Sequence, residues 1–286
     1  MIFIKTPFIN ILKRRFKLIN FPKKNIIWFV LDILFQREYF SKLKNKEEIR
    51  ELTNSTLIDG EGKKLAEYYY NKHFQTLDEL KKRRIGIMSQ SEATPMFEKM
   101  INFIRLNNLS DDENTYIIQL GSSLGRDLEF FLKIFPKLNY ISTDVNDEIL
   151  DFQKEKYNYS NLKYFKCYAE DINECIDYFN ISNKNIILFS SGSLQYLSPL
   201  FLESFFSKLR NYKTLNLFID EPTSISFIDN NNLISDNRGN ISFSHRYDQY
   251  AKKLGLNIIE SKIIRPYSTD DTHHGDTAHL YLQISN

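Results

Sequence analysis

The second half of the chain alternates short apolar runs with longer amphipathic stretches. The apolar runs predict five strands, at residues 116–120, 139–143, 162–166, 185–189 and 215–219. The stretches between them predict four helices, at residues 126–135, 147–157, 172–179 and 199–209. Strands that alternate strictly with helices of this length are typical of a parallel sheet with helices on both faces.

The end of the chain breaks this alternation. A helix predicted at residues 244–254 is followed by two strand patterns, at 257–264 and 277–284, which the loop 265–276 joins. Two strands connected in this way form an antiparallel pair at a sheet edge. The predicted fold class is therefore α/β: a doubly wound, seven-stranded, mostly parallel sheet with an antiparallel C-terminal strand, preceded by a helical N-terminal region.

The region in front of the sheet has a helical pattern. Apolar residues recur there at steps of three and four, as at Met96, Met100 and Ile104. The proline at position 95, directly after a threonine, is typical of a helix start. The polar stretch 107–113 is a candidate linker. We therefore divide the chain into a basic amphipathic segment at 1–45, a helical cap region at 46–112 and an α/β domain at 113–286.

Charge is distributed unevenly along the chain. The formal net charge is +2, but seven of the 38 basic residues precede the first acidic one, Asp32, so 31 basic and 36 acidic residues lie in the chain from Asp32 onward. Apolar residues interleave with those seven cations, which predicts either a basic helix pair docked on the α/β domain or a peripheral membrane contact. The apolar run 26–35 is too short to span a bilayer, and no signal-peptide cleavage pattern is visible.

The chain contains two cysteines, Cys167 and Cys175. Both fall in segments predicted as core, and their spacing is not that of a metal site. Two cysteines so placed exclude a disulfide framework and fit a reducing compartment. We therefore expect a cytoplasmic protein, with membrane-peripheral binding as the alternative.

A turn of small residues between the first strand and its helix is the strongest candidate for a binding site. Gly121, Ser123 and Gly125 leave little side chain in the way of a ligand that lies across the strand ends. The N-terminus of the following helix offers backbone N–H groups to such a ligand. Glycine in this position also occurs for tight packing alone, so the turn is not specific by itself.

Acidic residues follow at the ends of the next two strands. Asp144 lies roughly twenty residues past the glycine turn, where a carboxylate can accept both hydroxyls of a ribose. A helix cap is the other interpretation of an acid at this point, although Asp147 could serve as that cap. Glu170 and Asp171 follow the third strand, where a carboxylate can accept the exocyclic amine of an adenine. The three elements occur in the order that a nucleoside site requires.

These motifs resemble those of the class I S-adenosylmethionine-dependent methyltransferases, whose domain is Rossmann-like. The resemblance extends from about Asn114 to the C-terminus, and it implies S-adenosyl-L-methionine as the cofactor. It assigns the glycine motif to residues 119–125, the ribose acid to Asp144, the adenine-side acid to Asp171, and the segment beside the sulfonium to residues 190–197. The predicted cofactor-binding residues are Gln119, Gly121, Ser123, Gly125, Asp144, Val145, Glu170, Asp171, Ser191 and Ser193.

Two positions depart from the family pattern. The family usually has Asp or Glu at the place of Gln119, where the side chain contacts the methionine moiety; the glutamine carbonyl can accept a hydrogen bond but carries no charge. The middle glycine of the family motif is Ser123 here, which leaves less room. These departures keep open a catalytically silent adenosyl-binding or scaffold protein.

Other nucleotide-binding classes fit the sequence less well. A dinucleotide fingerprint would place its third glycine at Arg126, and a dinucleotide enzyme leaves the C-terminal strand pair unexplained. A nucleotide-sugar or NAD-dependent enzyme stays an alternative. A DNA or exocyclic-amine methyltransferase would carry an Asn/Asp-Pro-Pro-aromatic motif where this chain has residues 190–193. The near-neutral charge also argues against nucleic acid as a partner.

Methyl transfer from a sulfonium is an in-line displacement, so the protein must align acceptor and methyl group and exclude water. A hydroxyl acceptor also profits from a base within hydrogen-bond reach. The candidates are Glu221 after the fifth strand, His245 at the start of the next helix, and His273 and His274 in the loop 268–276. Two histidines and three acids in that loop could bind a divalent metal, but a solvated hairpin loop explains them as well, and no metal site is predicted.

The resulting hypothesis is a bacterial-type methyltransferase that acts on a small molecule. We expect O-methylation of a sugar or glycan precursor in preference to N-methylation, by analogy with stand-alone enzymes of this size. The sequence predicts no oligomeric state.

Overall fold

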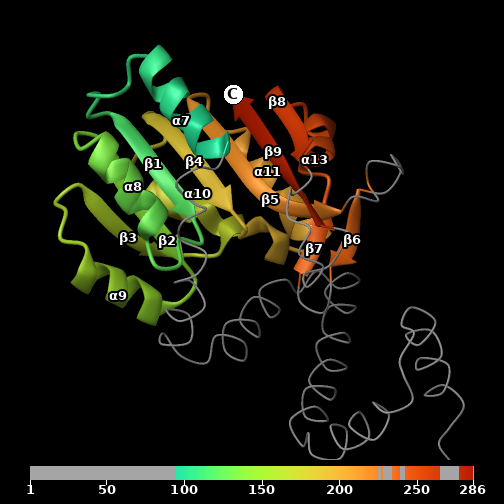
Figure 1. Cartoon of the computed structure of the whole chain (residues 1–286), viewed down its shortest axis with the longest axis horizontal. Helices are drawn as coiled ribbons and strands as arrows, with labels where there is room; N and C mark the ends of the chain where they lie inside the picture. The colour runs from blue at the N-terminus through green and yellow to red at the C-terminus, as the bar shows by residue number, and fades with distance from the viewer. Residues whose placement is uncertain (1–94, 225–226, 228–233, 239–241, 265–276, 286) are drawn as a thin grey trace, which may run out of the picture. The chain divides into compact units, whose positions relative to one another are not determined.

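The structure is a computed structural model, and it describes residues 95–224, 227, 234–238, 242–264 and 277–285 (Figure 1). The predicted basic segment 1–45 lies outside these residues, as do residues 46–94 of the predicted helical cap. The division of the chain at residues 45/46 and 112/113 therefore stays a prediction.

A seven-stranded sheet forms the centre of the described part, in the order β3-β2-β1-β4-β5-β9-β8. Its strands are β1 (Thr115–Leu120), β2 (Asn139–Asp144), β3 (Leu162–Lys166), β4 (Asn185–Ser191), β5 (Leu215–Ser224), β8 (Asn257–Ile264) and β9 (Thr277–Ser285). The first five pair in parallel, and β9 runs antiparallel to both of its neighbours, β5 and β8. The predicted fold class is confirmed.

Helices cover both faces of this sheet (Figure 1). They are α7 (Pro95–Leu106), α8 (Arg126–Ile134), α9 (Asp147–Lys156), α10 (Ile172–Tyr178), α11 (Pro199–Leu209) and α13 (Tyr247–Lys253). One buried cluster joins the sheet to α10, α11 and α13, and a second joins it to α7 and α8. Helix α7, which the sequence places in the cap region, thus contributes to the core of the α/β domain.

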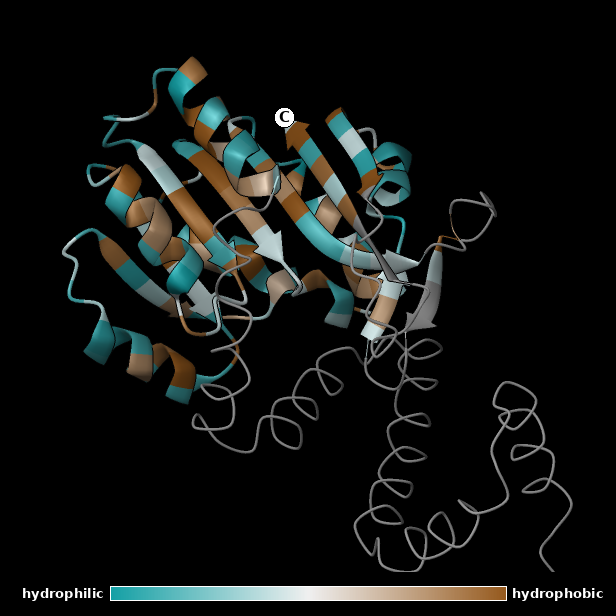
Figure 2. Cartoon of the chain, in the orientation of Figure 1, coloured by the Kyte–Doolittle hydropathy of each residue, from teal (hydrophilic) through white to brown (hydrophobic). Residues whose placement is uncertain are grey.

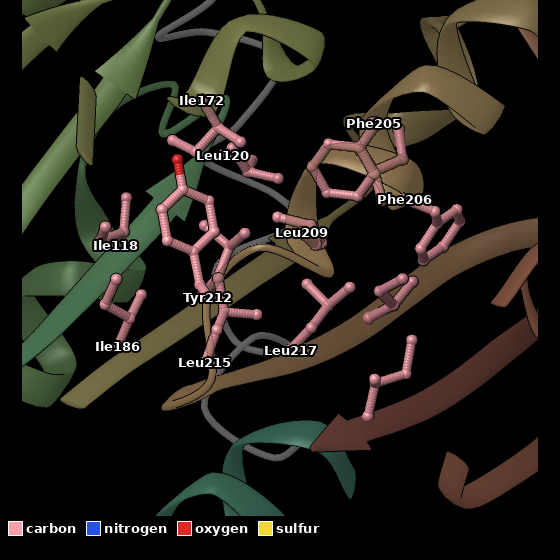
Figure 3. Packing of buried hydrophobic residues seen from close by; sticks show 14 of the residues in the cluster. Ile118, Leu120, Ile172, Ile186, Phe205, Phe206, Leu209, Tyr212, Leu215 and Leu217 are labelled. Atoms are coloured by element: carbon pink, nitrogen blue, oxygen red, sulfur yellow. The ribbon is translucent and has the colours of Figure 1, made fainter. Parts of the chain in front are cut away.

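The central strands are buried on both sides, which explains their nearly continuous apolar sequence. In β4, Ile186 and Leu188 belong to the first cluster, whereas Ile187 and Phe189 belong to the second. Figure 3 shows the first cluster, where side chains of β1, β4 and β5 meet those of α11. The helices instead alternate hydrophobic and hydrophilic residues along their length (Figure 2). Each helix therefore turns one apolar stripe toward the sheet.

Local sequence fixes where several helices begin and end. Helix α7 is described from Pro95 onward, and whether it begins there, as the sequence predicts, depends on residues outside the described part. The side chain of Asn146 caps α9 by accepting from the Glu148 N–H at 2.9 Å, so neither Asp144 nor Asp147 serves as the cap. Helix α13 ends before Gly255, whose φ of 71° is the left-handed conformation in which glycine stops helices.

Two predicted boundaries were wrong. The helix predicted at 244–254 begins at Tyr247, because residues 242–245 form strand β7 (Ser242–His245), which pairs with β6 (Ser235–Arg238). The fifth strand, predicted to end at residue 219, continues to Ser224, because β9 pairs with it over that whole length. The acidic pair Asp220 and Glu221 therefore lies within a strand and not in a loop after it.

None of the helices in the described part of the chain has the length and apolar character needed to cross a bilayer.

Candidate functional site

The turn between β1 and α8 adopts an unusual backbone. Gly121, Ser123 and Gly125 have φ angles of 61°, 53° and 73°, all in the left-handed region. Glycine adopts this conformation without strain, whereas it is about 1 kcal/mol less favourable for a serine. A Cβ atom on Gly121 would lie 2.2 Å from the Ser193 Oγ. The turn thus requires glycine both for its backbone angle and for the space beside it.

A buried polar network holds this turn from the side of β2 and α9. The Gln153 side chain, fully buried on α9, donates to the Ser123 carbonyl at 2.6 Å and to the Ser122 Oγ at 2.8 Å. The Ser142 Oγ on β2 lies 2.6 Å from both the Ser122 Oγ and the Gln153 Oε1. Because these groups bond to one another, groups of the chain itself hold the strained conformation of Ser123. The sequence does not predict this network, since a glutamine on an amphipathic helix gives no signal that it is buried.

Asp144, the last residue of β2, contacts the glycine turn directly. Its Oδ2 accepts the backbone N–H of Ser123 at 3.0 Å, and its Oδ1 accepts that of Asn146 at 3.1 Å. The side chain is 1% exposed, and the adjacent Val145 is half-buried. The predicted ribose acid and the predicted glycine turn are therefore in contact with each other.

Gln119, on β1, presents a buried acceptor beside the same turn. The side chain is 2% exposed, and its Nε2 donates to the Asp127 Oδ2 on α8 at 2.9 Å. A carboxylate oxygen can only accept this bond, so the amide nitrogen faces Asp127 and the Oε1 faces away from it. Among the residues that the structure describes, the Gln119 Oε1 has no hydrogen-bond partner. Buried polar atoms are rarely left without one, so this oxygen is a candidate ligand contact.

The adenine-side acids lie in the short 3₁₀ helix η2 (Ala169–Asp171) that follows β3. The backbone N–H of Cys167 donates to the Asp144 carbonyl at 3.2 Å, so this segment starts beside the end of β2. Glu170 is 2% exposed, and its carbonyl accepts from the Lys208 ammonium of α11 at 2.5 Å. The same ammonium lies 3.4 Å from an oxygen of Asp171. Lys208 thereby fixes both acids close to the end of β3.

The segment after β4, residues 192–197, is called here the post-β4 segment. It contains the 3₁₀ helix η3 (Leu194–Tyr196), and Gly192, with φ 78°, makes the bend into it. The Ser193 Oγ donates to the Gly121 carbonyl at 3.3 Å, which joins this segment to the glycine turn. Ser191, the last residue of β4, is half-buried and pairs with Asp220 of β5.

Glu221, predicted as a catalytic residue, is 0% exposed on β5. Its Oε1 accepts from the Ser190 Oγ at 2.5 Å and from the backbone N–H groups of Ser193 and Leu194 at 2.8 and 2.9 Å. Its Oε2 accepts from the N–H of Gln195 at 3.3 Å. Burial raises the pKa of this carboxyl group to about 7, against the opposing effect of these hydrogen bonds.

His245, a second predicted catalytic residue, is also 0% exposed. Its Nε2 lies 2.9 Å from the Leu197 carbonyl, which can only accept, so this nitrogen carries the proton. Its Nδ1 then accepts from the Ser235 hydroxyl at 2.7 Å, which in turn lies 2.7 Å from the Tyr250 hydroxyl. Burial lowers the pKa of His245 to about 3, so the ring is neutral.

Two further predicted catalytic residues, His273 and His274, lie outside the described residues. Within the part of the chain that is described, no group of three or more His, Cys, Asp or Glu side chains is arranged to hold a metal ion. The catalytic roles of Glu221, His245, His273 and His274 stay predictions, as do the individual contacts assigned to the cofactor-binding residues.

Comparisons with known proteins give similarity at the level of structure only. No family model matches the chain, and no curated protein matches it either. A methyltransferase from Aquifex aeolicus described as SAM-dependent is 13% identical, with 73% of this chain and 98% of that chain covered and a TM-score of 0.45. A SAM-dependent methyltransferase from Anabaena variabilis is 12% identical, with coverage of 65% and 83% and a TM-score of 0.45. Geranyl diphosphate methyltransferase in complex with SAM is 10% identical, with coverage of 65% and 84% and a TM-score of 0.44.

The chain's own strand order and pairing directions define its fold. Five parallel strands in the order 3-2-1-4-5, extended by an antiparallel C-terminal strand and the strand before it, make up the fold of class I S-adenosylmethionine-dependent methyltransferases. The resemblance stated for the sequence is thus confirmed for the fold.

Proposed function

We propose that this protein is an S-adenosylmethionine-dependent methyltransferase that acts on a small molecule. The observation that carries the proposal is the contact between the glycine turn and the acid of β2, in which the Ser123 N–H donates to Asp144. This contact joins two elements at the carboxyl ends of neighbouring parallel strands, which is where open α/β sheets bind their ligands. The proposal extends to the cofactor, the activity and the roles of the residues named below.

The buried polar atoms of the site fit the cofactor. The Gln119 Oε1 lacks a partner among the described residues, and it can accept from the ammonium group of an amino-acid moiety. Asp144 can accept from the ribose hydroxyls, while Glu170 and Asp171 stand near the same strand ends for the adenine amine. Gly121 and Gly125 let the turn pack closely on its neighbours, because a Cβ atom would meet Ser193 at the first and Gln153 and Tyr157 at the second. The acceptors therefore match three polar parts of the molecule: its ammonium group, its ribose hydroxyls and its adenine amine.

When bound, S-adenosylmethionine supplies a methyl group on a positively charged sulfur. The residues of this chain bind the two ends of that molecule, hold it in one orientation and exclude water from it. A fixed orientation allows the acceptor atom to approach in line with the bond that breaks. The post-β4 segment contacts Gly121 through Ser193, so it is the wall nearest to the middle of such a ligand.

For the acceptor we propose a hydroxyl group of a sugar or glycan precursor. An oxygen acceptor calls for a base, and neither His245 nor Glu221 is suited to it, since both are fully buried and bonded to other groups. His273 and His274 are therefore our candidates for the base. A catalytically silent relative is the competing proposal, favoured by the uncharged Gln119.

The test is a calorimetric titration of the full chain with four ligands: S-adenosylmethionine, S-adenosylhomocysteine, NAD and a UDP-sugar. We expect the first two to bind and the last two not to bind. Asp144→Ala should weaken binding of S-adenosylmethionine by about 1–3 kcal/mol, because charge-assisted hydrogen bonds are lost. Asp147→Ala, which removes an exposed carboxylate three residues away, is the control and should bind normally.

Each outcome of this titration separates two hypotheses. Binding of NAD or of the UDP-sugar in place of S-adenosylmethionine would refute the proposal in favour of the nucleotide-dependent enzyme. Equal affinity of the wild type and Asp144→Ala would refute the assignment of the ribose acid. Mass spectrometry monitors methyl transfer to hydroxyl and amine acceptors. If S-adenosylmethionine binds but no acceptor is methylated, the result favours the silent relative.

A further inference from the structure

The end of β5 places a buried carboxylate where its sheet neighbour has ended. Strand β4 pairs with β5 only as far as Ser191 and Asp220, so beyond that point one edge of β5 faces the post-β4 segment, while β9 still pairs with the other edge. Glu221 is the first residue past the last pair, and its side chain is completely buried. A charged group in such a place is costly unless every lone pair finds a donor.

Glu221 finds most of its donors in the backbone of the post-β4 segment. Three consecutive N–H groups, those of Ser193, Leu194 and Gln195, donate to its two oxygens, and the Ser190 hydroxyl adds a fourth bond. All three amides are thereby committed to a side chain of β5. They are not available to a ligand.

The other end of the post-β4 segment is held by a second buried group. The Nε2–H of His245 donates to the Leu197 carbonyl, and the Thr223 hydroxyl of β5 donates to the backbone carbonyl of His245 at 2.8 Å. Thr223 lies two residues after Glu221. Both attachments of the segment therefore lead back to the same few residues of β5.

At the first of these attachments the segment also meets the glycine turn. Ser193, whose N–H is bound by Glu221, is also the residue whose Oγ reaches the Gly121 carbonyl at 3.3 Å. The space above Gly121 is so limited that a Cβ atom there would lie 2.8 Å from the Ser193 Cβ. A shift of about 1 Å in the segment would therefore change the room left for a ligand at the turn.

We propose that Glu221 is a positioning residue, which fixes the post-β4 segment against the glycine turn, and that His245 fixes the far end of the same segment. This inference rests on the proposed function, because it gives both residues a role in shaping the cofactor site. Their burial and their bonds argue for this role over contact with the acceptor. An amide in place of the Glu221 carboxylate would turn an N–H donor toward another donor, so glutamine cannot reproduce all four bonds.

The test measures backbone amide exchange and ligand affinity in the full chain. In the ligand-free protein, we expect the amides of residues 193–195 to exchange at least tenfold faster in Glu221→Gln than in the wild type. Affinity for S-adenosylmethionine should fall about tenfold in the same variant. Ser190→Ala removes a single bond to Glu221, so it should raise exchange at the same three amides by a smaller factor while the chain stays folded.

Asp112→Asn is the matched control. Asp112 also accepts several hydrogen bonds, from Thr115, Asn114 and Asn185, but it lies at the opposite, amino-terminal edge of the sheet. Its variant should lower overall stability without changing exchange at 193–195 or the affinity for S-adenosylmethionine.

Three results would overturn or separate the claims. Unchanged exchange at residues 193–195 in both Glu221→Gln and Ser190→Ala would overturn the positioning role, and so would an equal effect of Asp112→Asn. Faster exchange with unchanged affinity would mean that Glu221 stabilises the segment without affecting ligand binding, which would overturn its role in the site. A wild type that binds no S-adenosylmethionine would refute the proposed function, while the exchange measurement would still decide how the segment is held.

Discussion

The two sides of the candidate site differ in how their polar groups are used. On the side of β1 and β2, the Gln119 Oε1 and the Ser123 Oγ are buried without a hydrogen-bond partner among the described residues. On the side of β4 and β5, Glu221 and His245 are both 0% exposed, Glu221 accepts four hydrogen bonds, and both ring nitrogens of His245 are hydrogen-bonded. We propose that the first side binds the ligand and call it the binding side; the second, whose polar groups hold the backbone, is called the holding side.

This difference shows that burial of an ionisable group does not by itself mark chemistry. Residues with strongly shifted pKa values are frequent in active sites, but structural networks shift pKa values as well. Burial shifts the pKa values of both Glu221 and His245, yet their partners are backbone groups and hydroxyls of the same chain. The side with the unpartnered Gln119 Oε1 is therefore the better candidate for binding.

The largest predicted effect is a loss of stability at the contact between the two sides, where Gly121 meets Ser193. Gly121→Ala places a methyl group 2.2 Å from the Ser193 Oγ in a left-handed backbone, so we expect the free energy of unfolding to fall by about 2–4 kcal/mol. Gly255→Ala is the control: it has a similar φ of 71° but nothing within 4 Å, so it should cost about 1 kcal/mol. Urea denaturation measures both, and equal losses would mean that the contact with Ser193 is not tight.

The structure agrees with the sequence prediction more closely at the glycine turn and Asp144 than at the boundaries of β5 and β7, for a physical reason. The glycine turn and Asp144 are recognisable because their backbone angles and their spacing along adjacent strands are local properties. The extension of β5 to Ser224 depends instead on pairing with β9, some sixty residues later in the chain. Pro222 lies within this extension, and a proline in the sequence predicts that a strand has already ended. The sequence places His245 in a helix, whereas it lies in strand β7. That strand is defined by its pairing with β6, which the local sequence does not predict.

The holding side should reveal itself in the pH dependence of stability. The pKa of Glu221 is raised by burial from 4.5 to about 7, so its contribution to stability is present below pH 4.5 and is lost as the pH rises to about 7. The pKa of His245 is lowered by burial from 6.5 to about 3, so its contribution is present above pH 6.5 and is lost as the pH falls to about 3. Between pH 4.5 and 6.5 the two slopes have opposite signs and nearly cancel.

Single variants should uncover each slope. From pH 6.5 to 4.5, we expect the free energy of unfolding of Glu221→Gln to fall relative to the wild type, by on the order of 1 kcal/mol per pH unit. His245→Gln, in which the amide nitrogen can still donate to the Leu197 carbonyl, should rise over the same interval. Denaturant titrations at three pH values measure this, and two variants that keep the wild-type profile would contradict the assigned pKa shifts.

The smallest effect tests whether the binding side keeps its capacity for a cationic group. Asp127 accepts from the Gln119 amide nitrogen, so the Gln119 Oε1 points away from Asp127. An asparagine at 127 could turn either its oxygen or its nitrogen toward Gln119, so the Gln119 amide could flip. Asp127→Asn should therefore weaken binding of S-adenosylmethionine by about 1 kcal/mol, because the acceptor is no longer fixed. Binding of 5′-methylthioadenosine, which lacks the amino-acid part, should not change.

Adding Gln119→Glu to Asp127→Asn restores a carboxylate beside the turn and should recover the affinity. If both ligands weaken equally in Asp127→Asn, the pair serves the fold of the turn, and the contrast between a binding side and a holding side fails at this position.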